Sequence, residues 1–133
     1  MVKMLRKLFI HSLDIVFLFF ALMAALIARF IAGPIISPRI VFGHVPILSY
    51  AHHARALQRA GFTASSFVSS VYAINSRDDW DKIMTSEFLW IPLGFRPYAI
   101  FIYGLFQYDI FVVSVEGFFL KRSLFYAQAY LFK

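Results

Sequence analysis

Two short loops in this sequence combine a glycine with a side chain that can move a proton. One loop contains Gly43 and His44, the other contains Glu116 and Gly117, and each follows a short apolar run. Histidine and glutamate are common general bases, and an acidic side chain can also hold sugar hydroxyls. A neighbouring glycine lets a substrate approach the backbone. We therefore predict these residues as substrate-binding, with tight turns carrying a solvated histidine and carboxylate as the alternative, and assign no catalytic residue.

The remaining ligand-type side chains give no metal-binding pattern. His52 and His53 are adjacent, so on a helix they point about 100° apart and do not easily share one metal. Asp78, Asp79 and Asp81 lack the glycine and the distal glutamate of a calcium loop, which favours helix capping by Asp78 or Asp79 and solvation. The sequence has no cysteine, and neither a GxSxG nor a GxxxxGK[ST] motif is present. We expect no metal site.

The first loop belongs to a strand, turn and helix that organise the chain. Residues 39–42 form an apolar run typical of a buried strand, and residues 62–68 predict a second one. A helix lies between them, with Ser49 placed as its cap and Gly61 where a helix usually stops. This order predicts the first βαβ unit of a Rossmann-like domain.

The second loop follows the clearest strand of the sequence, residues 110–115, whose continuous apolar character is typical of a parallel sheet. Residues 95–106 predict an apolar helix before this strand, and residues 118–133 predict another after it. The expected fold class is α/β: a partial Rossmann-like parallel sheet with flanking helices, preceded by an N-terminal hydrophobic membrane helix.

Composition favours contact with lipid. Hydrophobic residues make up 61% of the 133 residues and aromatic residues 20%, whereas soluble domains average about 45–50% apolar residues. The formal net charge is +6, from 13 Lys and Arg against 7 Asp and Glu. These basic residues do not form the dense stripe of a nucleic-acid binder, so we expect no nucleic acid and attraction to anionic headgroups instead.

The N-terminal segment predicts the membrane attachment. Residues 15–28 carry no charge, and the apolar character continues to residue 36, which gives the length that a spanning helix needs. We assign residues 1–37 to a membrane anchor helix, either spanning or lying in one leaflet, and residues 38–133 to an incomplete Rossmann-like domain. If the segment spans, the basic head with Lys3, Arg6 and Lys7 lies on the cytoplasmic side. If the anchor lies in one leaflet, the domain after it stays on the same side as the head.

The order of these elements resembles the start of a GT-B glycosyltransferase, a family built from two Rossmann-like domains with the active site between them. Residues 39–46 are similar to its first strand and glycine loop, and residues 54–62 to its helix end before strand two. Residues 108–114 resemble the later "yDvfh.h" strand, and residues 120–133 the helix that follows it.

The resemblance implies transfer of a sugar from a nucleotide sugar to an acceptor, without a metal-binding DxD motif. It implies that this amino-terminal, acceptor-side part lacks the carboxyl-terminal domain that holds the donor, so the fragment alone is expected to be inactive and to hold no cofactor. Gly43, His44, Glu116 and Gly117 are the site residues that it carries over. The expected partners are membrane lipid, a sugar acceptor (lipid-linked or not) and the missing domain, at the cytoplasmic face of the inner membrane.

The alternative to this reading is a small non-catalytic membrane protein with two or three hydrophobic helices. Its helices would be residues 15–36, 95–106 and 118–132. The strand-like runs argue against it, because open sheet edges cannot sit in lipid.

Overall fold

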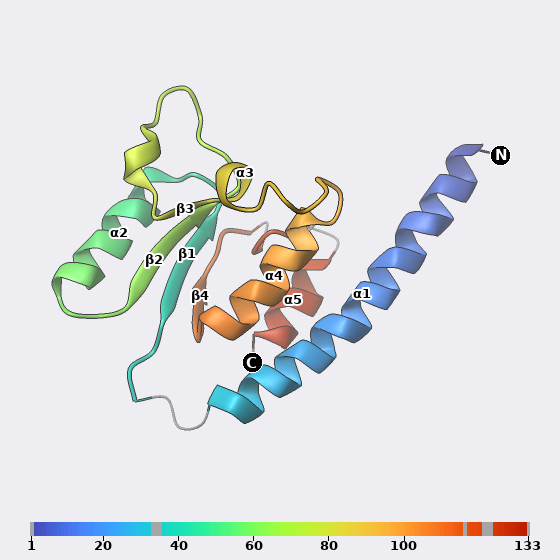
Figure 1. Ribbon diagram of the computed structural model, residues 1–133, viewed down its shortest axis with the longest axis horizontal. Coiled ribbons are helices and arrows are strands. Elements are labelled where there is room, and N and C mark those ends of the chain that lie inside the picture. Colours follow the sequence, from blue (N-terminus) through green and yellow to red (C-terminus); the bar gives the residue numbers. More distant parts are fainter. Residues whose placement is uncertain (1, 33–35, 116, 121–123, 133) are drawn as a thin grey trace.

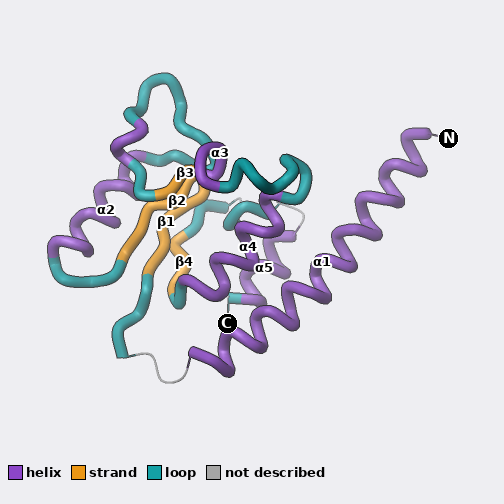
Figure 2. The backbone as a smooth tube through the Cα atoms, viewed as in Figure 1, coloured by secondary structure: helices purple, strands orange, loops and turns teal. Residues whose placement is uncertain are grey.

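The computed structural model describes residues 2–32, 36–115, 117–120 and 124–132 (Figure 2). The elements, in chain order, are helix α1 (Val2–Ala32), strand β1 (Ile40–His44), helix α2 (Leu48–Arg59), strand β2 (Ala64–Val68), the 3-10 helix η1 (Arg77–Asp79), strand β3 (Lys82–Ile83), helix α3 (Met84–Glu87), helix α4 (Arg96–Gln107), strand β4 (Ile110–Val112) and helix α5 (Phe125–Leu131).

The strands form one four-stranded, all-parallel sheet in the order β3-β2-β1-β4. Ile40 at the start of β1 is in register with Ala64 of β2 on one side and with Ile110 of β4 on the other. The predicted strands around residues 39–42, 62–68 and 110–115 are therefore confirmed as members of one parallel sheet. The last of them is shorter than expected, since β4 ends at Val112.

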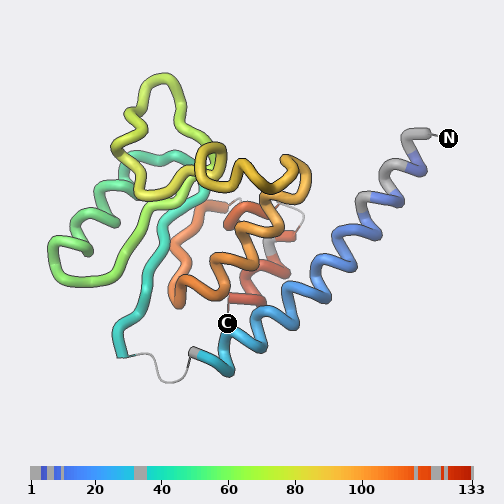
Figure 3. The backbone as a smooth tube through the Cα atoms, viewed as in Figure 1, coloured from blue at the N-terminus to red at the C-terminus, as the bar shows by residue number. Residues whose placement is uncertain are grey.

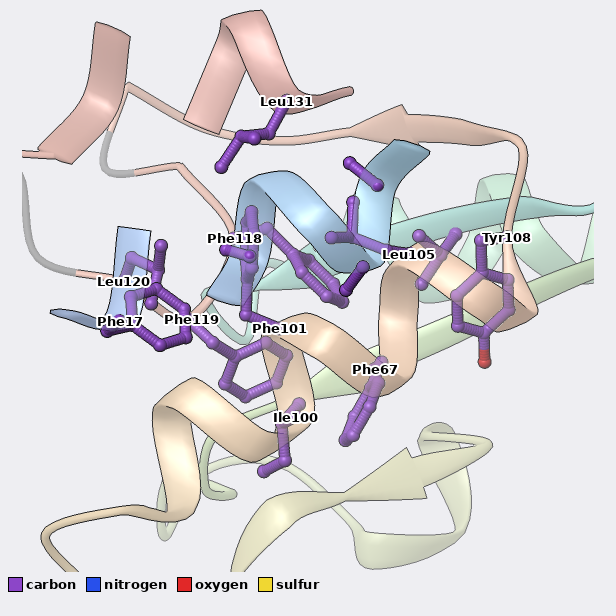
Figure 4. Packing of buried hydrophobic residues seen from close by; sticks show 14 residues of the cluster. Phe17, Phe67, Ile100, Phe101, Leu105, Tyr108, Phe118, Phe119, Leu120 and Leu131 are labelled. Atoms are coloured by element: carbon purple, nitrogen blue, oxygen red, sulfur yellow. The ribbon is translucent and has the colours of Figure 1, made fainter. Parts of the chain in front are cut away.

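Helices cover both faces of the sheet (Figure 1). Along a strand, successive side chains point to opposite faces. Phe67 accordingly lies in the main hydrophobic cluster with α4, whereas its neighbour Val68 packs in a second cluster with Ala51 of α2. The main cluster is rich in phenylalanine, and its rings interlock between α1, α4, the sheet and the C-terminal segment (Figure 4).

Helix α2 ends as predicted but begins differently. Gly61 has φ +87° after the last helical residues, the left-handed conformation that glycine adopts without a Cβ penalty. The N-cap is Ile47, which makes no side-chain cap hydrogen bond, and Ser49 already lies inside the helix. The predicted Ser49 cap is wrong, because the turn after Pro46 starts the helix two residues earlier.

The sequence predicts a short helix capped by Asp78 or Asp79 that continues through Trp80 and Ile83, and this is wrong: Trp80 is extended and Ile83 belongs to β3. The helix found in the aspartate-rich segment is η1, which ends at Asp79 and is capped by Ser76. Ser76 Oγ accepts from the backbone N–H of Asp78, and Asp79 bonds back to the N–H of Ser76, which makes a capping box. Asp79 thus supports the cap from the third helical position.

The helix predicted from residue 118 starts later than expected. Residues 118–120 form a bend, and the helix in the described part of this segment is α5, Phe125–Leu131. Gly117 has φ +81° and Phe119 has φ +63°. A right-handed helix cannot run through such conformations, so the chain turns before α5 can begin.

Helix α1 is docked on the α/β part and does not hang free. Its inward stripe consists of Phe17, Ala21, Ala24 and Ala25, which are buried in the main cluster beside α4 and α5. The segment His11–Ile31 is long and apolar enough to cross a membrane. The part before this stripe projects beyond the body of the molecule (Figure 1).

Polar contacts hold α1 at both ends of this stripe. Asp14, buried on α1, accepts a hydrogen bond of 2.6 Å from the hydroxyl of Tyr98 on α4. Near the other end, Arg29 donates to the carbonyls of Tyr130 and Leu131, at 3.5 and 3.3 Å. The boundary expected near residue 37 therefore separates two segments that share one hydrophobic cluster.

An ion pair joins β1 to β4 at the amino-terminal edge of the sheet. Asp109 accepts from the Arg39 backbone N–H at 2.8 Å and from its guanidinium at 3.1 Å through both carboxylate oxygens. These hydrogen bonds lower the pKa of Asp109 below its ordinary value and raise that of Arg39.

We expect Asp109→Asn to lower the free energy of unfolding by about 1–3 kcal/mol near neutral pH. Because the folded pKa of Asp109 lies below the unfolded value of about 3.9, its contribution is present above about pH 4 and is lost as pH falls through the folded pKa. Equilibrium denaturation of both proteins at about pH 7 and about pH 3 checks this. An equal difference between the two proteins at both pH values would contradict it.

Candidate functional site

The candidate site lies where the sheet order reverses. The chain builds β2 and β3 on one side of β1 and returns to place β4 on the other side. In open parallel sheets, ligands bind outside the carboxyl ends of the strands at such a point. Here the β1 end is His44, and the segment after β4 comes close to it (Figure 3).

The structure brings His44 and Gly117 together. His44 Nδ1 lies 2.9 Å from the carbonyl oxygen of Gly117. Because a carbonyl only accepts, this contact puts the proton on Nδ1 and leaves Nε2 as the acceptor nitrogen of the neutral ring. The ring also packs against Phe119 at 5.2 Å between centroids. A half-buried imidazole held in one tautomer can accept a proton or a hydrogen bond from a hydroxyl.

Gly43 is explained by strand packing. An added Cβ would lie 2.0 Å from the carbonyl oxygen of Phe67 on β2. The space beside this glycine is thus occupied by the neighbouring strand, whereas the sequence predicted that a substrate would use it. Gly43 sets how closely β1 and β2 approach, and so where His44 lies.

Gly117 and its neighbours are held by a residue that the sequence analysis missed. Gln128 on α5 is 1% exposed, and its Oε1 accepts from the backbone N–H of Phe118 at 2.7 Å. A Cβ on Gly117 would meet the Gln128 side chain at 2.6 Å. In the sequence, the feature that could have indicated this buried polar contact is a single glutamine in an otherwise apolar helix. Glu116, the fourth predicted site residue, lies outside the described residues.

The loop after β2 contributes Asn75, a second residue that the sequence analysis missed. Its Nδ2 donates to the carbonyl of Pro46, in the loop after His44, at 3.4 Å. Among the described residues its buried Oδ1 has no hydrogen-bond partner. A buried acceptor without a partner costs about 1–3 kcal/mol, and a ligand hydroxyl or a water could satisfy it.

The aspartates have structural partners. Asp79 pairs with Arg55 at 3.3 Å, and Asp81 accepts from the backbone N–H and hydroxyl of Ser66 at 2.7 and 3.0 Å. In the parts of the chain that the structure describes, no three His, Asp or Glu residues are grouped as metal ligands would be. Comparison of the chain with protein-family models, with curated proteins and with solved structures finds no match.

We expect Gln128→Leu to disturb the site through the turn after Gly117. The variant leaves the Phe118 N–H buried without this acceptor, which should lower the free energy of unfolding by about 1–3 kcal/mol. The nitrogen signals of the His44 ring should move away from the Nδ1-protonated pattern, as NMR would detect. Gln107→Leu, at an exposed position on α4, is the matched control and should change stability by less than about 0.5 kcal/mol.

Proposed function

We propose that this chain is the amino-terminal, acceptor-binding part of a membrane-associated GT-B glycosyltransferase. The observation that carries the proposal is the carboxyl end of β1, where His44 lies at the reversal of an all-parallel sheet. The order β3-β2-β1-β4 is that of the first four strands of a doubly wound Rossmann sheet, whose ligands bind at this place. The Rossmann-like assignment is part of the proposal.

In this proposal His44 and Asn75 hold the acceptor. Nε2 of His44 accepts the hydrogen bond, and then the proton, of the hydroxyl that attacks the sugar donor. Asn75 Oδ1 accepts from a second hydroxyl and so gains the partner that it lacks among the described residues. The nucleotide sugar would be held by a second domain that these residues do not supply.

NMR titration of the isotope-labelled chain in detergent micelles tests the proposal. Methyl hexosides should shift the His44 ring signals and the Asn75 side-chain amide signals, and the shifts should be lost in Asn75→Leu. The backbone amide signal of Asp81, which directly precedes β3 and donates to Ser66 Oγ, serves as the internal reference. If no hexoside perturbs either residue, the proposal fails.

The chain by itself should not turn over nucleotide sugars. The proposal places the donor-binding groups on another domain, so UDP-glucose and GDP-mannose should be neither hydrolysed nor transferred to a hexoside by the purified protein. Product analysis with radiolabelled donors measures this. Turnover by the 133 residues alone would contradict the proposed division of labour.

The attachment of the protein to a membrane is the part of the proposal with the most direct support, since one described helix is long and apolar enough to span. The proposed location is the cytoplasmic face of the inner membrane, because an anchor in one leaflet keeps the basic residues at the start of the chain and the domain after it on the same side, and the anionic cytoplasmic leaflet attracts basic residues. The second candidate is a non-catalytic membrane protein with two or three hydrophobic helices. It is less well supported, because α4 and α5 have 12 and 7 residues and a spanning helix needs roughly 20.

A further inference from the structure

A groove of about 520 Å³ lies between α1, the start of α4 and the bend after Gly117. Its lining includes Leu13, Phe17 and Phe20 from α1, Pro97 and Ile102 from α4, and Phe119 from the bend. The volume falls within the roughly 300–1,000 Å³ of typical small-molecule sites.

The walls of this groove suit a hydrocarbon and little else. The side-chain hydroxyl in the lining belongs to Tyr98, and it donates to Asp14 at 2.6 Å. The other lining residues that the structure describes are apolar or glycine. A polar ligand would lose its hydration here without gaining hydrogen bonds, whereas an alkyl chain gains free energy with each buried methylene.

The rim of the groove continues into surface suited to lipid. Val16, Phe20 and Phe95 line the groove and are 53, 59 and 58% exposed, so the groove is open beside them. The segment that leads into α4 adds Trp90, which is 81% exposed, and tryptophan is enriched at membrane–water interfaces. A chain leaving the bilayer along α1 would therefore meet apolar surface up to the groove.

The docking of α1 fixes how the protein can meet the bilayer. If the docked helix stood across the membrane, the sheet and the irregular segments beside it would lie at the depth of the hydrocarbon, where unpaired backbone groups are too costly. Lying along the interface, α1 buries its outer apolar face in one leaflet and keeps the sheet in water.

We propose that the groove binds one hydrocarbon chain of a membrane lipid while α1 lies in the plane of one leaflet. Phe119 both lines the groove and packs on the His44 ring at 5.2 Å. The groove therefore adjoins the residue that packs on His44 at the carboxyl end of β1. The identity of this lipid as the sugar acceptor rests on the proposed function; the binding of the chain does not.

Photolabelling in vesicles tests the groove. The protein is bound to vesicles of phosphatidylcholine and phosphatidylglycerol in which part of the phosphatidylcholine carries a diazirine near the end of one acyl chain. After irradiation, labelled residues are mapped by mass spectrometry. We expect label on Ile102 and on the bend at Phe119, besides the rim of α1. Label confined to outward residues of α1, such as Phe19 and Met23, would overturn the proposal, because it would show ordinary contact with lipid.

Matched tryptophan variants sharpen the test. Val16 lines the groove and is 53% exposed, whereas Ile27, 47% exposed on the same helix, lies outside the lining. Val16→Trp should lower labelling of Ile102 by about tenfold, the loss expected when about two methylenes are kept out of the groove. Ile27→Trp should leave it unchanged, and both proteins should still sediment with vesicles. Equal labelling of Ile102 in the two variants would overturn the proposal.

The two proposals fail separately in these experiments. If groove residues are labelled but no hexoside shifts the signals of His44 or Asn75, the lipid-chain proposal stands and the sugar-acceptor proposal is rejected. Hexoside shifts at His44 without groove labelling would keep the proposed function and reject the lipid chain.

Discussion

Gly43→Ala is expected to lower the free energy of unfolding by at least about 3 kcal/mol, at the upper end of the usual cost of overpacking. The new Cβ would lie 2.0 Å from the Phe67 carbonyl oxygen, whereas ordinary contact begins at 3.4 Å, so β1 and β2 would have to separate by about 1.4 Å. Gly43 is paired with Phe67 in the middle of the sheet. Backbone atoms on both sides leave no flexible side chain to give way.

Equilibrium denaturation of Gly43→Ala beside Gly94→Ala measures this effect. An added Cβ at Gly94 would have nothing within 4 Å, so this control should change stability by less than about 0.5 kcal/mol. If Gly43→Ala does not fold, its circular dichroism spectrum will lack the folded signal that Gly94→Ala retains, and this difference also shows that the added Cβ at position 43 is destabilising. Equal stability of the two variants would show that the strands can separate freely.

Tyr98→Phe should weaken the docking of α1 by about 1–3 kcal/mol, because it removes a hydrogen bond to a buried carboxylate. Burial, and then the bond to Asp14, raise the pKa of Tyr98 to about 12. The phenol therefore keeps its proton and donates throughout the physiological pH range. Hydrogen exchange of the α1 amides between Asp14 and Arg29 should become faster by one to two orders of magnitude, since about 1.4 kcal/mol is a factor of ten.

A double variant separates the hydrogen bond from simple packing. In Asp14→Leu/Tyr98→Phe no carboxylate is left without this donor, and the contact becomes apolar on both sides, so exchange should return towards the wild-type rate. Tyr103→Phe on the same helix, whose hydroxyl bonds Lys82 and not α1, is the control and should leave α1 exchange unchanged. Additive effects of the two substitutions would contradict the proposed coupling.

The parts of the fold that were predictable from sequence are those with strong local signals. Three elements were predictable because each has its own hydrophobic periodicity and a residue that ends or begins it. They are the strand that contains Gly43, the helix before Gly61 and the strand after Asp109. The start of α2 was not predictable, since Ser49 is an acceptable cap that the turn after Pro46 pre-empts. The bend after Gly117 was hidden by a run that is apolar enough for a helix.

The site was predicted in part for a related reason. Strand ends are readable from sequence, so His44 and Gly117 could be singled out, and the parallel sheet then brings them within 2.9 Å. Gln128 and Asn75 act through contacts with residues far along the chain, which no local pattern encodes. The docking of α1 depends on Asp14 meeting Tyr98, and in the sequence Asp14 is only a charge that interrupts an apolar helix. The glycosyltransferase assignment stays a prediction.

The contacts of α1 also have a consequence for the order of synthesis. Tyr98 on α4 is synthesised 84 residues after its partner Asp14, and Tyr130 on α5 is synthesised 101 residues after its partner Arg29. At about 5–20 residues per second, α1 waits roughly 4–20 seconds for them. During that interval the apolar face of α1 lacks its partners on α4 and α5 and would be exposed to water. A lipid surface suits the composition of this helix and can cover that face. The nascent chain would then reach the bilayer before the sheet exists, and the protein would fold onto a helix that is already in place.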